Sequence, residues 1–211
     1  MMNPKPAASL YLEADWVPPT RTSPSLMSTP ITQWMAWEGG VDLVALTRTG
    51  LSMPNVIVHV ARVVHTPAGS APSGMIFWQP DPAAPPAVMG FISTNPTVGA
   101  YFGPKIFAGT PFEGAPVLTA AIEIETGGDF VGAKITVAGH VFQTRLSSLQ
   151  PAVLVQRAPG GMTPFTQQGV EATATRAQLW VDGTEVPLIV PPVGISGGPA
   201  AVSAPCGLYA R

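Results

Sequence analysis

Charged residues are scarce in this sequence. Asp, Glu, Lys and Arg make up 10% of its 211 residues, where about 25% is usual in soluble proteins. Hydrophobic residues stand at 46%, which is ordinary, so the deficit falls on the surface. A free monomer usually keeps a charged exterior to stay soluble. A surface with so few charges predicts that part of the exterior is covered. The covering would come from further copies of the chain in a homo-oligomer, or from other structural subunits of the same assembly.

Cysteine is almost absent. The single cysteine, Cys206, excludes a disulfide within the chain and a thiolate metal cluster built by one chain. A chain of this length buries roughly 70% of its unfolded surface and needs no cross-link to fold. We expect Cys206 to be an inert small hydrophobe.

Long hydrophobic runs and basic clusters are also missing. Segments such as Ala87–Ile92 are far shorter than the ~20 apolar residues of a membrane-spanning helix. No apolar stretch follows Met1–Pro6, as it would in a signal peptide. The Lys and Arg residues are scattered singly, whereas phosphate contacts require clusters of them. We therefore expect no membrane span, no signal peptide and no direct contact with nucleic acid, and a location in a virion or in the cytoplasm.

Proline, in contrast, is abundant. Each of the 25 prolines would cost ~3 kcal/mol inside a helix. The longest interval between them, 116–151, is interrupted by glycines at 127, 128, 132 and 139. Within it, Ile and Glu alternate over 122–125, which indicates a half-buried strand.

Further strands are predicted wherever β-branched and aromatic residues lie between turn formers. The candidates are Ser9–Glu13, Ile31–Trp37, Val41–Thr47, Asn55–Val64, Gly74–Trp78, Ala87–Ser93, Lys105–Ala108, Val117–Thr126, Phe130–Val137, His140–Leu146, Ala152–Arg157, Ala177–Val181, Glu185–Val190 and Ala200–Ala204.

Two hairpins and one ambiguous window complete this pattern. Asp182-Gly183 and Ala138-Gly139 are predicted to form tight hairpin turns. The segment Gln167–Trp180 is free of proline and rich in Ala, Gln and Arg, so it is either a strand or the single helix.

Many short strands without alternating helices predict an all-β fold. We expect an antiparallel β-sandwich or jelly roll, or a barrel-like variant, with at most one short helix. Residues 1–30 are polar and spaced by prolines, and are predicted to be an extended arm that reaches over the domain or a neighbour, or else a partly ordered tail. Residues 31–211 are predicted to form a single β domain.

No recognisable catalytic machinery is visible. The segment 194–198 matches G-x-S-x-G around Ser196, but the nucleophile elbow requires a helix directly afterwards, and Pro199 is a poor start for one. No Asp, Glu or His follows Ser196 to complete a triad. We interpret the segment as a glycine-rich loop and expect no enzyme activity.

Several dispersed ionisable residues are candidates for a metal-binding or catalytic site. His59 and His65 lie six residues apart in one predicted strand, roughly 20 Å, too far to share a metal. Glu123, Glu125 and Asp129 could bind Ca²⁺ or act as acids with His140, or could form a solvated outer face. The solvated face is the simpler interpretation, so we expect no metal, no cofactor and no catalytic residue.

The tryptophans are candidates for an interaction surface. Trp16 and Trp78 flank proline-rich loops, and Trp180 precedes the Asp182-Gly183 turn. For all the tryptophans the default interpretation is burial in the core.

Three functional hypotheses follow from the sequence: a structural subunit, a binding module and, least favoured, an enzyme whose site is assembled from dispersed residues such as Glu123, His140 and Asp129. The first is a structural assembly subunit, such as a capsid or decoration protein of a virus or phage particle, supported by low charge, strand architecture and the arm. The alternative is a carbohydrate- or ligand-binding β-sandwich module.

Deleting residues 1–30 tests the arm. We expect the truncated chain to lose assembly, because arms that reach onto neighbours lock subunits together, while its β domain stays folded. Light scattering after size exclusion, with circular dichroism as the folding control, measures both. Assembly unaffected by the deletion would contradict the arm.

Overall fold

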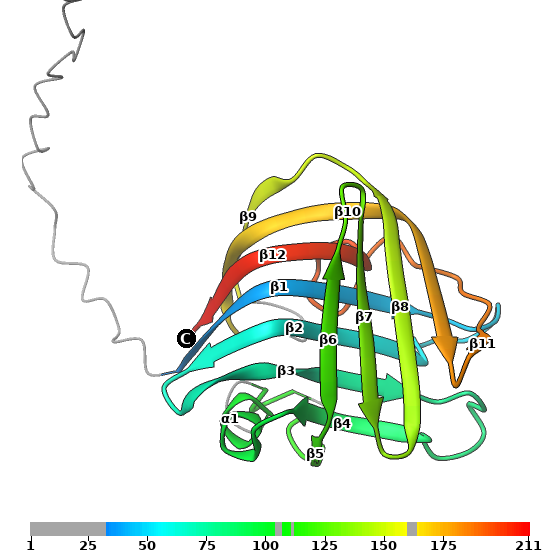
Figure 1. The fold of residues 1–211 in the computed structure, drawn as a ribbon, viewed down its shortest axis with the longest axis horizontal. Coiled ribbons are helices and arrows are strands. Elements are labelled where there is room, and N and C mark those ends of the chain that lie inside the picture. The colour runs from blue at the N-terminus through cyan, green and yellow to red at the C-terminus, as the bar shows by residue number, and fades with distance from the viewer. Residues whose placement is uncertain (1–32, 104–106, 111, 160–163) are drawn as a thin grey trace, which may run out of the picture. The chain divides into compact units, whose positions relative to one another are not determined.

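The chain forms a nearly all-β structure. The computed structural model describes residues 33–103, 107–110, 112–159 and 164–211. Twelve strands join into one mixed sheet that is nearly closed into a barrel (Figure 1). The elements are β1 (Trp34–Ala45), β2 (Val56–Thr66), β3 (Gly69–Trp78), β4 (Val88–Ser93), α1 (Pro96–Tyr101), β5 (Val117–Thr119), β6 (Ala121–Thr126), β7 (Phe130–Val137), β8 (His140–Leu149), β9 (Val153–Arg157), β10 (Thr166–Val181), β11 (Thr184–Glu185) and β12 (Ala201–Ala210). The predicted all-β class is confirmed, and the predicted arm over residues 1–30 lies outside the described residues.

Two bent segments fold the sheet into two layers. The strand order is β5-β4-β3-β2-β1-β12-β10-β8-β7-β6, with β9 and β11 added beside β10, and only β4 and β5 run parallel. The first half of β10 pairs with β12 and β9, and its second half with β8 and β11. Likewise β5 pairs with β4, and β6, one residue further on, pairs with β7. Strands that switch sheets in this way form the corners of such folds.

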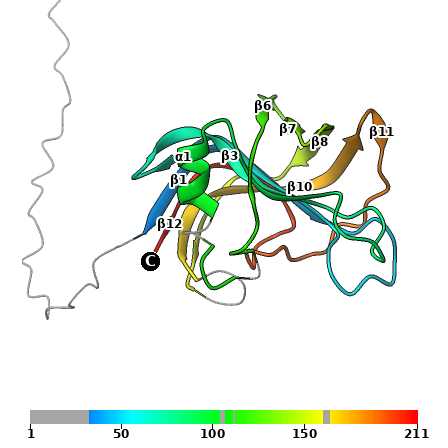
Figure 2. The ribbon, with the colours of Figure 1, turned by 90° about the horizontal axis from the view of Figure 1, so that it is seen from below.

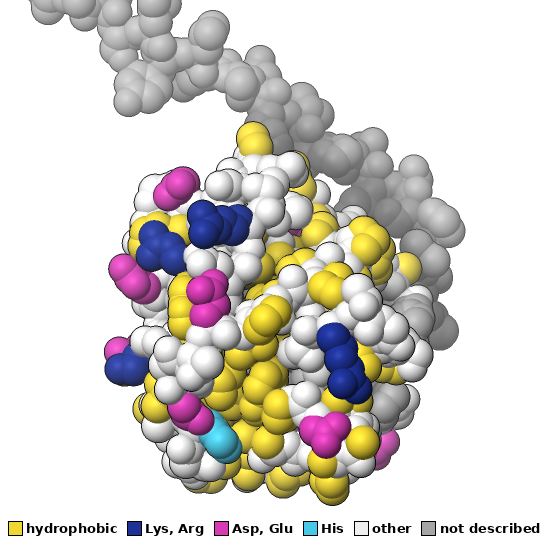
Figure 3. Space-filling view, turned by 90° about the vertical axis from the view of Figure 1, so that its right-hand side faces the viewer, with side chains coloured by type: hydrophobic (Ala, Val, Ile, Leu, Met, Phe, Trp, Pro, Cys, Tyr) yellow, Lys and Arg dark blue, Asp and Glu magenta, His cyan; other side chains and the backbone are white. Residues whose placement is uncertain are grey.

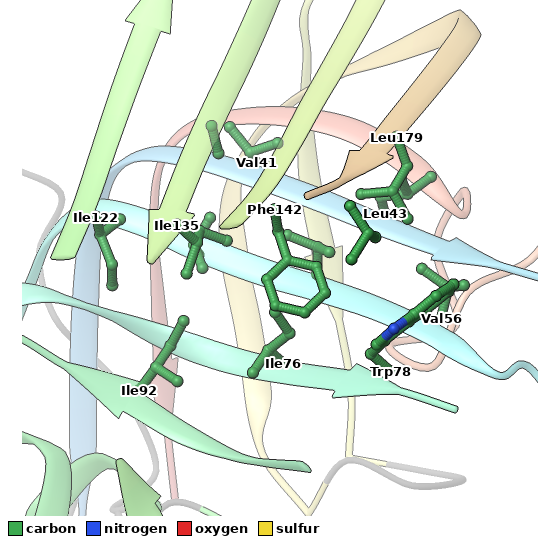
Figure 4. Close-up of a cluster of buried hydrophobic side chains, with 14 of the residues drawn as sticks. Val41, Leu43, Val56, Ile76, Trp78, Ile92, Ile122, Ile135, Phe142 and Leu179 are labelled. Atoms are coloured by element: carbon green, nitrogen blue, oxygen red, sulfur yellow. The ribbon is translucent and has the colours of Figure 1, made fainter. Parts of the chain in front are cut away.

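The two layers enclose the main core. The small layer consists of β6, β7, β8, β11 and the second half of β10, and it crosses one face of the large layer formed by the remaining strands (Figures 1 and 2). Side chains from both layers meet there, among them Leu43, Ile76, Ile135, Phe142 and Leu179 (Figure 4). Each buried side chain of this size contributes roughly 1.5–3 kcal/mol.

The opposite face of the large layer holds a second core. Phe91, Phe102 and Phe107 form an aromatic cluster there with ring centroids 5.1–5.5 Å apart. The helix α1 immediately precedes Phe102. Asn95 caps α1 by accepting a hydrogen bond from the Thr97 amide at 2.9 Å, and Pro96 occupies its first turn.

Trp37 lies in this second core on a floor of glycines. A side chain at Gly207 would overlap the Trp37 ring, and one at Gly40 would approach both that ring and the Ala204 carbonyl. The indole Nε1 donates a hydrogen bond to Ala204 O at 3.2 Å. The ring can lie flat on the sheet because these positions have no side chain.

The structure confirms most of the strand predictions and corrects a few. Phe130–Val137 has the predicted bounds, and the segments Ile31–Trp37 and Val41–Thr47 merge into β1 across Gly39, whose φ is +63°. Both predicted hairpin turns are present, with positive φ at Ala138 and Gly139 and at Asp182 and Gly183.

Three further segments differ from expectation. Gln167–Trp180 is a strand, so the helical alternative there is wrong, and the helix lies at Pro96–Tyr101 instead. Glu185–Val190 shortens to β11 and one bridge between Leu46 and Ile189, and residues 107–108 of the predicted strand Lys105–Ala108 form a turn. The predicted strand Ser9–Glu13 is outside the described residues. Cys206, expected to behave as a small hydrophobe, is exposed.

Gly207→Ala tests the glycine floor. The added methyl group collides with Trp37, and overpacking of this kind costs about 1–3 kcal/mol of unfolding free energy. Gly128→Ala is the matched control, because nothing lies within 4 Å of a methyl group there. Urea unfolding of both variants measures the difference, and equal stability would show that Trp37 does not depend on Gly207.

Candidate functional site

The outer face of the small layer carries an ordered row of polar side chains. The strand register aligns Glu123, Lys134, Gln143, Trp180 and Glu185 across five neighbouring strands. Alternation along each strand turns these side chains away from the core, where Ile122, Ile135 and Phe142 point inward. Trp180 is half-buried, and the other four residues are exposed.

A second row runs beside the first and contains a gap. It aligns Glu125, Gly132, Arg145 and Gln178. Gly132 has no side chain to fill its position in this row, and its backbone is buried. The guanidinium of Arg145 lies 3.7 Å from the centroid of the Phe130 ring. The result is an open groove of about 610 Å³, which we call the outer groove. Its lining residues are Glu123, Ile124, Glu125, Phe130, Gly132, Ala133, Lys134, Gln143, Thr144, Arg145 and Trp180.

The charges of the outer groove are available for contacts. Within the described part of the chain, the ion pairs join His59 or His65 to an acid, Arg62 to Glu38, His140 to Asp182 and Arg157 to Glu171. None of these pairs includes Glu123, Glu125 or Lys134. Their polar groups therefore face solvent in the groove.

A polar cluster lies beneath the opposite face of the large layer, beside Trp37. The Glu171 carboxylate accepts two hydrogen bonds of 2.6 Å from the Arg157 guanidinium and one of 2.9 Å from Gln167. Glu171 is 8% exposed, so this bidentate pair is largely withdrawn from water. It joins β9 to β10, and it satisfies a carboxylate that would be costly to bury alone.

A second acid–base pair lines the same region. His59 Nδ1 lies 3.2 Å from Asp42 Oδ2, across the β1–β2 pairing. Burial disfavours the charged imidazolium, but the charge and hydrogen bond of Asp42 outweigh it and raise the pKa of His59 above the ordinary histidine value. Burial also raises the pKa of Tyr209, so its phenol stays protonated.

The turns of the two predicted hairpins are joined by His140. Its Nδ1 lies 2.8 Å from Asp182 Oδ2, and Asp182 Oδ1 accepts a hydrogen bond from the Val141 amide at 2.8 Å. The Val141 amide and His140 lower the pKa of Asp182. The contact between His140 and Asp182 connects the β7–β8 turn to the β10–β11 turn at the end of the small layer, near the row that contains Trp180.

The strand β9 forms an exposed apolar edge. It pairs with β10 along one side and with no other described strand. Leu154 is 88% exposed and Val153 57% exposed. The other exposed large hydrophobic residues in the described part of the chain are Met53, Met89, Ile189, Val190 and Val193. On the face shown in Figure 3, hydrophobic side chains gather in a band with charged groups on either side.

The structure separates the predicted interaction residues. Trp180 lines the outer groove, whereas Trp78 is 8% exposed and packs against Phe142 in the main core, so it offers no free ring. Trp16 lies outside the described residues. Glu123 and Glu125 join Trp180 in the groove, on the outer face that the simpler interpretation predicted.

The other candidates remain apart. Asp129 is exposed beyond the groove, and the described residues contain no group of three His, Cys, Asp or Glu side chains able to hold a metal ion. Ser196 lies in a turn closed by the Gly194 amide and the Gly198 carbonyl, and β12 follows it in place of the helix that a nucleophile elbow needs. No described helix is long and apolar enough to cross a membrane.

The sequence alone did not predict that Lys134, Gln143 and Arg145 join the groove, or that Arg157 pairs with Glu171. Lys134, Gln143 and Arg145 follow from the same alternation as Glu123, once the order β6-β7-β8-β10 is known. The pair Arg157–Glu171 joins residues 14 apart in the sequence, and the β9–β10 register places Arg157 opposite Gln167, which itself donates a hydrogen bond to Glu171. Comparisons with protein-family models, curated proteins and solved structures found no match to this chain.

The His59–Asp42 pair predicts a pH-dependent stability. Because the pKa of His59 is raised in the folded state, protonation stabilises the fold at low pH, and this contribution is lost as the pH rises through that pKa, above about 6.5. The melting temperature of the native protein should exceed that of His59→Gln most at about pH 5.5, and the gap should narrow toward about pH 8.5.

His65→Gln is the matched control for this measurement. His65 and Glu38 are 37% and 54% exposed, so their pair contributes little. A melting-temperature gap that stays constant with pH in His59→Gln would contradict the assignment.

Proposed function

We propose that this protein is a structural subunit that associates with copies of itself, as a shell or decoration protein of a virus or phage particle. The observation that carries the proposal is the exposed apolar edge strand β9, with Leu154 88% exposed. Such an edge in a chain with so few charges favours contact with another subunit.

Among the described residues, no further strand covers this edge, and β9 itself contains no proline. Exposed edges are usually protected by charged side chains, proline or a covering segment. Within β9 the one charged residue, Arg157, is engaged by Glu171, which leaves Val153, Leu154, Val155 and Gln156 without charge. The backbone of β9 pairs with β10 over five register positions, and the Arg157–Glu171 pair adds a side-chain connection between the two strands. A second strand can therefore add to a preformed edge.

The energy available at this edge is appreciable. Removing a leucine side chain from water contributes roughly 1.5–3 kcal/mol to the free energy of association. In a symmetric contact between two copies, each copy buries its own leucine. Because β9 is only five residues long, stable association needs further buried area.

An apolar pocket is a second surface that a partner could cover. It has a volume of about 370 Å³, and its lining includes Leu51, Met53, Phe77, Phe112 and Ile195. Met53 is 63% exposed beside it. An exposed methionine at an apolar pocket is typical of protein contact surfaces.

Leu154→Lys tests this proposal. We expect the native chain to form oligomers or larger particles whose mass rises with concentration, and the variant to shift toward single chains because it places a charge in an apolar contact. The measurement is light scattering after size exclusion over a range of protein concentrations.

Thr136→Lys is the matched control, because it adds the same charge at an exposed position on β7, away from β9. Its association should equal that of the native chain. A native chain that stays single at high concentration would overturn the proposal, and equal effects of the two variants would exclude β9 as the contact.

A further inference from the structure

We propose that the outer groove is a binding site for a neutral saccharide, with Trp180 as the stacking surface and Gln143, Lys134 and Glu123 as hydrogen-bonding groups. This inference is independent of self-association through β9. It gives a specific site to the carbohydrate-binding alternative that the sequence left open.

Trp180 provides a fixed aromatic surface. It is the fourth residue of the first polar row, between Gln143 on β8 and Glu185 on β11. The ring is half-buried, so it is held in place and still lines the groove. The C–H faces of a sugar ring are apolar and pack on an indole, while its hydroxyl groups project sideways toward polar neighbours.

The neighbours of Trp180 match those hydroxyl groups. Gln143 offers both an amide donor and a carbonyl acceptor, Lys134 offers donors and Glu123 offers acceptors. Hydrogen bonds from hydroxyl groups to charged partners are stronger than neutral ones. Gln178 donates to Glu185 Oε1 at 3.0 Å, which fixes that carboxylate beside the ring.

The charge of the groove favours a neutral ligand. Its lining contains two carboxylates, Glu123 and Glu125, and two cations, Lys134 and Arg145, so the charges cancel. Nucleic acids and sulfated polymers require an excess of positive charge to replace their counterions. A polar, uncharged ligand rich in hydroxyl groups is complementary to alternating charges of both signs.

The size of the groove suits an oligosaccharide. Its volume of about 610 Å³ lies within the usual range for ligand sites. The gap at Gly132 lets a ligand approach the backbone between Glu125 and Arg145, and the guanidinium of Arg145 is held on the Phe130 ring at the side of the gap. The floor belongs to paired strands, so the site is preformed.

Binding is measured on the full chain with a microarray of neutral oligosaccharides of glucose, xylose, mannose and galactose, followed by calorimetric titration of the strongest ligand. Heparin and single-stranded DNA serve as anionic probes. We expect binding of a neutral saccharide that weakens by about tenfold or more in Trp180→Ala and in Gln143→Ala. Trp180→Phe, which keeps an aromatic ring, should retain part of the affinity.

Gln156→Ala is the matched control for Gln143→Ala, because Gln156 is an exposed glutamine on β9 outside the groove. Leu154→Lys should bind as the native chain does, which separates this site from self-association. The proposal is overturned if no neutral saccharide binds, if binding is confined to heparin or DNA, or if the exposed Gln143→Ala variant binds as tightly as the native chain.

Discussion

The strand β10 is the constraint on which the rest of this structure depends. It is 16 residues long, and its register with β12 shifts between Val170 and Ala172. Up to Thr173 it pairs with β12 in the large layer, and Glu171, at the shift, holds β9 through Arg157. From Ala174 onward it pairs with β8 in the small layer and carries Trp180 into the outer groove. A straight strand could not serve both layers, because the two sheets cross.

The turns and the alternating strands could be predicted from sequence because their causes are local. Asp182-Gly183 needs only two residues with positive φ, and the Ile–Glu alternation at 122–125 defines a core face by itself. Whether Gln167–Trp180 forms a helix or a strand is not decided by its local sequence. Its Ala and Gln residues fit a helix, and pairing with four neighbouring strands overrides that preference. Trp78 and Trp180 likewise look alike in sequence, and only the arrangement of the layers buries Trp78 and leaves Trp180 half-buried in the groove.

The buried polar cluster explains how an apolar edge strand remains ordered. Only one side of β9 is paired, so hydrogen bonds to β10 alone would hold it weakly. The bidentate Arg157–Glu171 pair adds a connection that is largely withdrawn from solvent, and Gln167 supports the same carboxylate. Breaking such a pair leaves a buried charge without a partner, which costs about 3–5 kcal/mol. In the proposed association, a partner would therefore meet a strand that is already ordered.

Charged residues are not spread evenly over the surface, and their distribution connects the proposed self-association with the proposed saccharide site. Glu123, Glu125, Lys134 and Arg145 are concentrated on the outer face of the small layer, whereas β9 presents Val153 and Leu154. From Val170 to Trp180 the chain advances ten residues, or roughly 33 Å along the strand. Association through β9 would cover neutral surface and leave the charged face with its groove open to solvent. In the proposed assembly, the residues left in contact with solvent would thus include those of the proposed saccharide site.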